Sequence, residues 1–453
     1  FLKKQSVIIN PSFKTDSFSE RFLEDILKRE KWLFILFAVV AFALNSCQLF
    51  VDDDDDGSSE AQTSTTEAPI AEATLAFSTD AKSLNIVPMN ESITLSVKAE
   101  VSANTVSYQW YESSDGTTAK AFAIQGATGT SYEVPAATSR GIRYYYCTAT
   151  TAETKINSSV AIVVCTGLPL LQIDTENSAT PSPAKEKVNG RLQIFYPNGE
   201  KYDSGDKNEF TIKVRGNATA GYPKRPYKLK LPKKANLIDP NSSSNKDKNW
   251  VLLAGYCDKT LLRSKTGFYA ASLFNEIAGN EQLYVPASEF VDVVLNGEYI
   301  GNYCLTDSVK EGSSRVSVNE KNTVEGGIGF VAEYDPSYYA NEAKWFKSSV
   351  KSYPYTFKFP DTDDADFDSY MAQFENTIND FEAALYAENS EAWKNYIDIE
   401  SFARWFLVHN ILANIDTNYF LSKKDSSSTS KLVMGPVWDF EWSIGIGWDD
   451  GSR

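Results

Sequence analysis

Apolar and polar residues alternate in several short segments between residues 73 and 166 of this 453-residue chain. Segments 93–97, 106–110, 143–147 and 159–164 alternate with a period of two, and turns rich in Gly, Ser and Asp separate them. This period is typical of strands that bury one face. Regularly spaced short strands predict an all-β sandwich over residues 73–166.

The pattern changes after residue 167, where longer strands come first and helical periods follow. Asn296-Gly297 separates two of the strands and predicts a tight hairpin. Apolar residues recur with the spacing of an α-helix in segments 260–278, 367–387 and 399–413. Strands followed by helices predict an α+β domain with two lobes over residues 167–453. The expected strands are 168–173, 191–196, 210–214, 250–254, 290–295, 299–305 and 329–334.

Two short acidic motifs close the chain, one at Asp416 and one at Asp439. A strand starting at Phe420, a polar turn at 425–430 and a second strand from Leu432 lie between them. A hairpin brings its two ends together, so we expect the two aspartates to meet. Phosphoryl transfer needs such a pair, one carboxylate to accept the hydroxyl proton and one to hold Mg²⁺. Two solvated turn residues would give the same local pattern.

Positive charge gathers in one segment of an otherwise acidic protein. The net charge is −16, which argues against general nucleic-acid binding, yet residues 207–237 carry nine Lys or Arg and one Glu. Arg215 precedes a Gly-Asn turn, and Lys228 and Lys230 share one face of the expected strand. Such a face can hold phosphate oxygens. A solvated basic edge strand is the alternative.

The N-terminal region is typical of an export signal over residues 1–47. Charged residues precede an apolar core at 32–44, which is short for a membrane span, and the core ends in a Leu-Asn-Ser-Cys motif. This motif resembles a bacterial lipobox, which predicts a lipid anchor at Cys47. The acidic, Ser/Thr-rich segment 48–72 is then a disordered tether. An uncleaved anchor helix remains the alternative, and the true start is uncertain because the chain lacks an initial Met.

The remaining cysteines and the single histidine exclude several kinds of site. Cys147, Cys165, Cys257 and Cys304 form no Cys-x-x-Cys pair, which argues against a zinc site. His409 lies in an apolar helical period, where packing explains it. Mechanisms built on Ser-His-Asp or Cys-His are therefore not expected.

Trp110, with Tyr145 two residues before Cys147, resembles the pattern of an immunoglobulin-like domain. The resemblance implies a Trp packed in the core and a Tyr that makes a corner hydrogen bond. The strand at 92–101 carries no cysteine, so the usual inter-sheet disulfide is not expected. A spacer role is the expectation for this domain, with ligand binding as the alternative.

Residues 168–447 together resemble the CotH kinase family, the spore-coat-type atypical protein kinases. The resemblance depends on landmarks in the right order rather than on any single motif. They are Arg215-Gly-Asn, Pro223-Lys-Arg-Pro-Tyr-Lys228, Trp250-Val-Leu-Leu, Asp258, Leu261-Leu-Arg263, Leu295-Asn-Gly-Glu-Tyr-Ile-Gly-Asn-Tyr303, Gly327-Ile-Gly-Phe-Val-Ala-Glu333, Asp398-Ile-Glu-Ser-Phe402, Asn414-Ile-Asp416 and Gly435-Pro-Val-Trp-Asp-Phe440.

The resemblance implies a protein-kinase-like domain that transfers phosphate from ATP to protein Ser or Thr with Mg²⁺ or Mn²⁺. Asp416 then matches the catalytic-loop aspartate and Asp439 the metal-binding aspartate, with Asn418 as a possible second metal ligand.

The same resemblance implies phosphate-binding cations. Arg215 and Lys228 are the candidates, and Glu333 or Asp307 is expected to pair with that cation as in kinase Lys-Glu pairs.

Two features depart from the family pattern. Glu441 stands where members often have Asp, and the chain stops at Arg453, where a further helical stretch is expected. The kinase domain is therefore expected to be incomplete at its C-terminus.

Two functions compete at this point. One is an exported, lipid-anchored kinase that phosphorylates Ser/Thr-rich proteins of the cell surface or spore coat. The other is a cell-surface adhesin with a kinase-like but inactive domain.

Overall fold

The computed structural model describes residues 75–445, except 102–104, 207, 280–282, 389 and 417. The predicted export signal, tether and lipid anchor at Cys47 lie outside the described residues. Within the described ranges, the structure contains no helix that is long and apolar enough to cross a membrane. The described part of the chain is mostly β, with three α helices.

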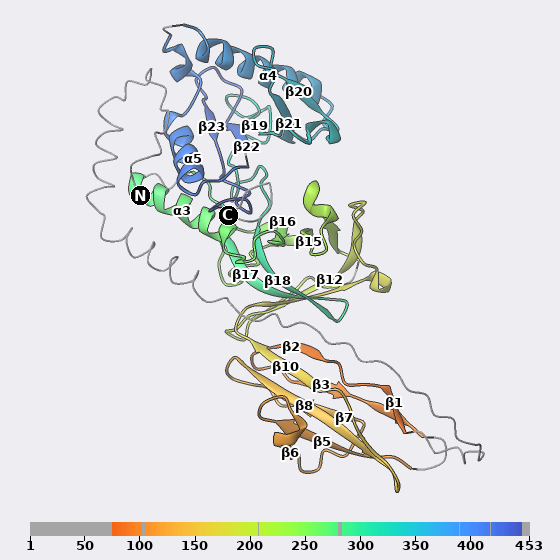
Figure 1. The fold of residues 1–453 in the computed structure, drawn as a ribbon. Coiled ribbons are helices and arrows are strands. Elements are labelled where there is room, and N and C mark those ends of the chain that lie inside the picture. The colour runs from red at the N-terminus through yellow and green to blue at the C-terminus, as the bar shows by residue number, and fades with distance from the viewer. Residues whose placement is uncertain are drawn as a thin grey trace, which may run out of the picture. The chain divides into compact units, whose positions relative to one another are not determined.

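The first part of the described chain is built from strands, apart from one short 3-10 helix at Thr118–Lys120 (Figure 1). A six-stranded sheet has the order β2-β10-β8-β5-β6, with β9 paired to β8, and β3–β7 and β1–β4 form two smaller sheets. The strands are β1 Ala76–Thr79, β2 Leu84–Pro88, β3 Ile93–Ser96, β4 Lys98–Glu100, β5 Ser107–Ser113, β6 Ala121–Ala123, β7 Ser131–Val134, β8 Gly141–Thr150, β9 Lys155–Asn157 and β10 Ala161–Thr166.

One apolar core holds these sheets together. Trp110 on β5 is fully buried in it, and its indole N–H donates to the carbonyl of Gly129 at 3.0 Å. Cys147 lies in the same core as a free thiol, so the expected lack of a disulfide is confirmed. The expected corner bond is wrong, because the Tyr145 hydroxyl contacts the Glu112 carboxylate at 3.2 Å. These two residues face each other across β5 and β8.

The next eight strands form a sheet that closes on itself. Its order is β11-β17-β18-β16-β15-β14-β12-β13, and β11 pairs with β12 as well as with β17. Closure encloses one core of inward-facing residues, including Phe210 and Trp250. Asn296 and Gly297 adopt positive φ, as the predicted hairpin turn requires. The strands are β11 Leu170–Thr175, β12 Val188–Phe195, β13 Lys201–Asp203, β14 Phe210–Val214, β15 Tyr227–Ala235, β16 Asp247–Leu253, β17 Ser288–Leu295 and β18 Glu298–Asp307.

A second, five-stranded sheet has the order β20-β21-β19-β22-β23. Helix α4, Phe367–Leu385, packs its apolar stripe on this sheet, and Phe374 is fully buried against Phe330 and Phe357. The strands are β19 Phe330–Tyr334, β20 Trp345–Lys347, β21 Pro354–Phe359, β22 Tyr419–Lys423 and β23 Leu432–Met434.

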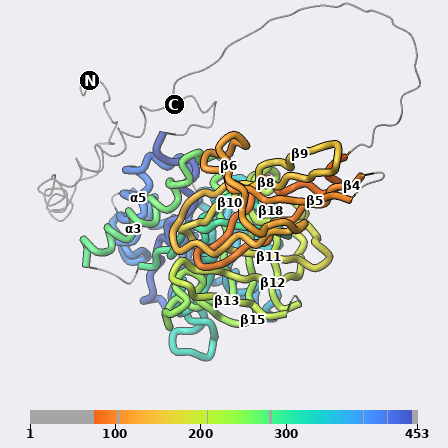
Figure 2. Tube along the Cα trace, turned by 90° about the horizontal axis from the view of Figure 1, so that it is seen from below, coloured from red at the N-terminus to blue at the C-terminus, as the bar shows by residue number. Residues whose placement is uncertain are grey.

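Helices α3, Arg263–Ala278, and α5, Ile399–Ile411, lie side by side (Figures 1 and 2). The carboxylate of Asp258 accepts from the backbone N–H of Arg263 at the start of α3, and α3 ends at left-handed Gly279. Asp398 caps α5 by accepting from the Ser401 N–H at 2.8 Å. Both helices were expected from the sequence, and α5 leads directly into the segment that carries Asp416.

Candidate active site

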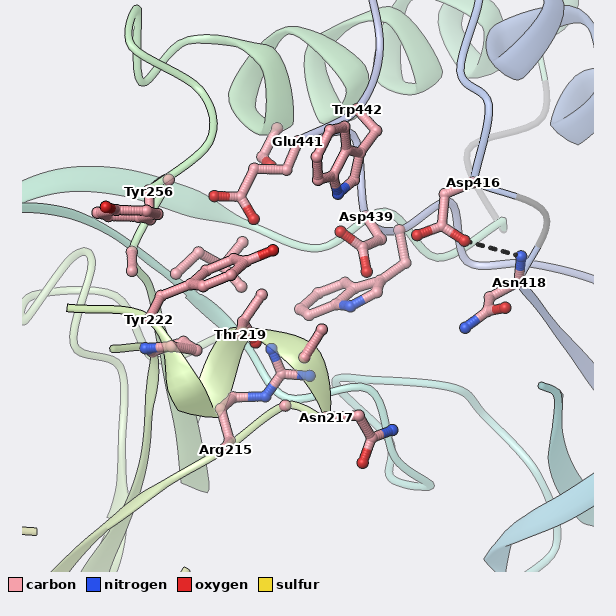
Figure 3. Close-up of a pocket in the computed structure, with 18 of the residues that line it drawn as sticks. Arg215, Asn217, Thr219, Tyr222, Tyr256, Asp416, Asn418, Asp439, Glu441 and Trp442 are labelled. Atoms are coloured by element: carbon pink, nitrogen blue, oxygen red, sulfur yellow. Dashed lines mark hydrogen bonds between the residues drawn. The ribbon is translucent and has the colours of Figure 1, made fainter. Parts of the chain in front are cut away.

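A cavity of about 280 Å³ lies between the closed sheet and the second sheet. Its lining comes from the loop between β14 and β15, the end of β16, strands β19 and β21, and the segments that flank the β22–β23 hairpin. Acidic and basic side chains face each other across it (Figure 3). The charged and amide residues of the lining are Lys185, Arg215, Asn217, Lys224, Asp258, Glu333, Asp335, Glu342, Lys358, Asp416, Asn418, Asp439 and Glu441.

The hairpin brings the two aspartates together as the sequence predicts. Strand β22 pairs with β23 in antiparallel register, with Leu421 opposite Met434. Asp416 precedes the first strand and Asp439 follows the second, and both line the cavity. The Asp416 carboxylate accepts from the Asn418 N–H at 3.3 Å, which orients it at the start of the hairpin.

Asn414 joins the two acidic segments through one side chain. Its amide nitrogen donates to the backbone carbonyl of Asp439 at 3.0 Å, and its amide oxygen accepts from the Asp416 N–H at 3.3 Å. The same amide nitrogen lies 3.1 Å from Nδ1 of His409, which is buried and whose pKa burial lowers to about 4. His409 is therefore neutral and accepts this hydrogen bond, so it supports Asn414 rather than catalysing a step.

Asp439 sits in a left-handed backbone conformation, with φ of 60°. Such a conformation is uncommon for a residue other than Gly and persists only where its surroundings hold it. Trp438 and Phe440 on either side are buried, and both rings contact Phe268 of α3 at centroid distances of 5.7 Å and 6.3 Å. Packing of the flanking aromatic rings thus fixes the direction of the Asp439 carboxylate.

Gly267 lies where α3 meets the Phe440 ring. A Cβ at this position would lie 2.1 Å from a ring atom, so the ring must move. We expect Gly267→Ala to destabilise the fold by about 1–3 kcal/mol, despite the better helix propensity of Ala, because the core is overpacked. Chemical denaturation measures this loss, and Ser272→Ala on the exposed face of α3 is the control. Equal stability of Gly267→Ala and wild type would contradict the tight packing.

Burial raises the pKa of Asp439 to about 7, and repulsion from Asp416 and Glu441 adds to this increase. Arg215 opposes the increase by attraction. A bound cation stabilises the ionised form of a carboxyl group that lies among other carboxylates, because attraction to the cation offsets the repulsion between the carboxylates. The electrostatics of the acidic side thus favour a bound cation.

Arg215 lies opposite the acidic residues, at the start of the Arg-Gly-Asn turn (Figure 3). Gly216 has φ of +85°, and a Cβ there would lie 2.0 Å from the Thr219 hydroxyl oxygen, so the turn requires glycine. The Arg215 guanidinium lies 5.8 Å from the Trp438 ring centroid. One cation thus contacts the segment that carries Asp439.

Glu333 on β19 forms its ion pair with Lys358 of β21, at 2.8 Å. Burial lowers the pKa of Lys358, but attraction and hydrogen bonding to Glu333, together with attraction to Glu342, outweigh burial and the net pKa is raised. Lys228 is not among the residues that line the cavity, and burial together with neighbouring cations lowers its pKa to about 8. The structure therefore corrects the expected partner of Glu333, which is Lys358 rather than Arg215 or Lys228. Asp307 pairs elsewhere, with Arg315 at 3.0 Å.

Glu441 lines the cavity beside Asp439, but its carboxylate also accepts from the Cys257 N–H at 3.4 Å. Burial raises the pKa of Glu441, and its backbone hydrogen bonds oppose the increase. The Glu441 side chain, which is longer than that of Asp, therefore reaches toward the end of β16. This explains how the site accommodates Glu at a position where the CotH pattern often has Asp.

A family model described as "CotH kinase protein" matches residues 212–453, which is more than half of the chain. The chain belongs to the CotH kinase family. The matched residues include every side chain proposed from the sequence as a site residue, Asp307 among them.

Comparison with curated proteins finds no match to this CotH family member. Among solved structures, the four N-terminal Ig domains of Dscam1 isoform 4.44 match with 14% identity and a TM-score of 0.18, covering 36% of this chain and 43% of that one. Sidekick-1 immunoglobulin domains 1–5 match with 11% identity and a TM-score of 0.17, covering 39% and 36%. The chain spans less than half the length of these structures, and TM-scores this low carry no conclusion about its fold.

The CotH family implies ATP and a divalent metal, and the residues of the cavity fit both. Among the described residues, no group of three or more His, Cys, Asp or Glu side chains forms a ready metal cage. Mg²⁺ rarely needs one, since it is commonly held by one or two carboxylates together with substrate phosphates. Asp439, with its raised pKa, is the carboxylate best suited to this role, and Arg215 and Lys358 suit phosphates.

Sequence reasoning missed Lys358 of this CotH domain. The residue lies in segment 354–359, which is rich in aromatic residues and was not assigned to the sheet. Only the pairing of β21 with β19 brings Lys358 next to Glu333. An apolar period with one lysine is the only signal in the sequence, and it does not by itself indicate a binding site.

Proposed function

We propose that this CotH family member is a protein kinase that transfers the γ-phosphate of ATP to Ser or Thr of a protein substrate. One observation carries the proposal: Asp416 and Asp439 line the same cavity as Arg215 and the Lys358–Glu333 ion pair. Two carboxylates opposite two cations can supply a metal ligand, a proton acceptor and phosphate contacts, which are the recurring parts of phosphoryl-transfer sites. An adhesin with an inactive domain would have no need for this arrangement.

Each residue has a separate role in the proposed reaction. Asp416 accepts the proton of the substrate hydroxyl as it attacks the γ-phosphorus, and the bond from that phosphorus to the bridging oxygen of ADP breaks. Arg215 and Lys358 bind phosphate oxygens and orient them. Asp439 holds the divalent metal, with Asn418 as a second candidate ligand. When bound, the metal neutralises the charge that develops on the phosphoryl group.

We further propose that the two halves of this region act as two lobes, as in protein kinases. The closed sheet supplies Arg215, while the second sheet and its helices supply Lys358, Asp416 and Asp439. This division supports the proposal because the candidate nucleotide site then lies between the lobes.

Lys358→Met should weaken ATP binding about 10- to 100-fold, since a charge-assisted hydrogen bond to phosphate is lost. Isothermal titration calorimetry with ATP and Mg²⁺ measures the change. Lys228→Met is the matched control, because it removes a partly buried lysine that does not line the cavity. A larger loss in Lys228→Met than in Lys358→Met would reverse this assignment.

The direct test of the function is incubation of the chain with γ-labelled ATP, Mg²⁺ or Mn²⁺ and a Ser/Thr-rich peptide. The proposal predicts label on Ser or Thr that requires the metal. Absence of transfer with either metal, together with absence of ATP binding, would favour the adhesin.

We propose that the protein is exported and lipid-anchored, with surface or spore-coat proteins as substrates. The support is the apolar core at 32–44 followed by Cys47. Cys47→Ser should leave an unprocessed precursor without lipid label after growth with radiolabelled palmitate. Label that persists in this variant would refute the anchor.

A further inference from the structure

A second and larger cavity, of about 510 Å³, lies between α3, α5 and the β22–β23 hairpin. Among the residues that the structure describes, it shares no lining residue with the candidate active site. Its volume falls within the range of small-molecule binding sites, roughly 300–1,000 Å³. The proposed kinase reaction makes no use of it, so its lining has to be explained separately.

Two buried donors of the lining lack acceptors. Nε of Arg315 and Nε1 of Trp405 are both buried, and neither has a hydrogen-bond partner among the described residues. Arg315 is only 3% exposed, although its terminal nitrogens contact Asp307 and Asn245. A buried donor that lacks an acceptor destabilises the folded protein. Both groups can only donate hydrogen bonds, so a ligand that satisfies them must carry acceptor atoms.

The lining also carries positively charged side chains. Three cationic side chains, Arg315, Arg404 and Lys424, line the cavity with a single carboxylate, Asp398. The Asp398 carboxylate is already engaged as the cap of α5. Lys424 is exposed at the end of β22 and can reach a ligand without a burial cost. Arg315 and Arg404 already form ion pairs with Asp307 and Glu400, so Lys424 is the cation that a bound anion would engage, while Val408 and Val437 supply apolar contact.

We propose that this cavity binds a small oxyanion, whose oxygens accept from Trp405 and Arg315 while Lys424 neutralises its charge at the rim. Carboxylate and phosphate groups share this acceptor chemistry. The inference does not depend on the proposed kinase function.

The test is calorimetric titration of the full chain with citrate and, separately, with pyrophosphate, in the absence of divalent metal. Trp405→Phe is the decisive variant, because it removes the indole N–H and keeps a ring to stack on His409, whose centroid lies 4.0 Å away. We expect it to weaken binding of at least one probe about 10-fold or more. Lys424→Ala should weaken the same binding event.

Two controls match these variants. Phe406→Leu changes an exposed aromatic residue on the same helix, and Lys431→Ala removes an exposed lysine of the same hairpin. Both should bind like wild type. Arg215→Ala separates the two cavities, since it should remove only binding in the candidate active site.

Binding of either probe that is weakened by Trp405→Phe and Lys424→Ala but survives Arg215→Ala supports the proposal. Three results would overturn it: no binding of either probe at millimolar concentration, binding unchanged in both cavity variants, or complete loss in Arg215→Ala. In each of these cases the second cavity is not an oxyanion site.

Discussion

Asp416→Asn should slow phosphoryl transfer by a factor on the order of 10²–10⁴ while ATP binding with Mg²⁺ stays close to that of wild type. An amide cannot accept the proton of the substrate hydroxyl, so the step that depends on a general base fails. The amide oxygen can still accept from the Asn418 N–H, which keeps the start of the hairpin in place. Single-turnover transfer of labelled phosphate measures the first effect and calorimetry the second.

Asp425→Asn provides the control, because Asp425 lies in the turn at the other end of the same hairpin and bonds locally to Ser427. It should transfer phosphate at the wild-type rate. A transfer rate for Asp416→Asn within a few-fold of wild type would remove Asp416 from the role of base.

Asp439→Asn should do two opposite things: abolish metal-dependent ATP binding and stabilise the free protein. The first follows because a neutral amide is a poor ligand for Mg²⁺. The second follows because burial, Asp416 and Glu441 all raise the pKa of Asp439, to about 7. Removing this charge relieves the repulsion, and Asn also tolerates the left-handed backbone at this position.

The direction in which stability changes with pH follows from the pKa of Asp439 in the folded and unfolded states. The ordinary pKa of 3.8 describes the unfolded chain, and the folded value is about 7. Between these values the folded state keeps a proton that the unfolded state has released, so wild-type stability falls as pH rises through this window. Above pH 7 the loss is complete, on the order of 2 kcal/mol after allowance for partial exposure.

Urea unfolding of wild type and Asp439→Asn at pH 5 and pH 8, without metal, measures this effect. The stability gain of the variant should be larger at pH 8. An equal gain at both pH values, or a loss of stability at pH 8, would show that Asp439 carries no buried charge.

The parts of the fold set by local pattern were predictable from the sequence. Period-two alternation located β3, β5, β8 and β10 of the first β region. Asn296-Gly297 identified the β17–β18 hairpin of the closed sheet by the positive φ that both residues need. The meeting of Asp416 and Asp439 was predictable for the same reason, because a short polar turn leaves only one way to pair β22 with β23.

The parts set by distant contacts were not predictable. Closure of the large sheet depends on the pairing of β11 with β12 and with the distant β17, which no local period indicates. The partner of Glu333 depends on the pairing of β19 with β21. Lys228 has the right charge and strand position, but the packing of the closed sheet leaves it outside the cavity lining.

Titration of wild type and Asp439→Asn with ATP, with and without Mg²⁺, tests whether this cavity binds a metal–nucleotide through Asp439. We expect Mg²⁺ to strengthen ATP binding to wild type and to have no such effect on Asp439→Asn. Equal binding of Mg²⁺-ATP by the two proteins would contradict the assignment of this cavity as the nucleotide site of a kinase.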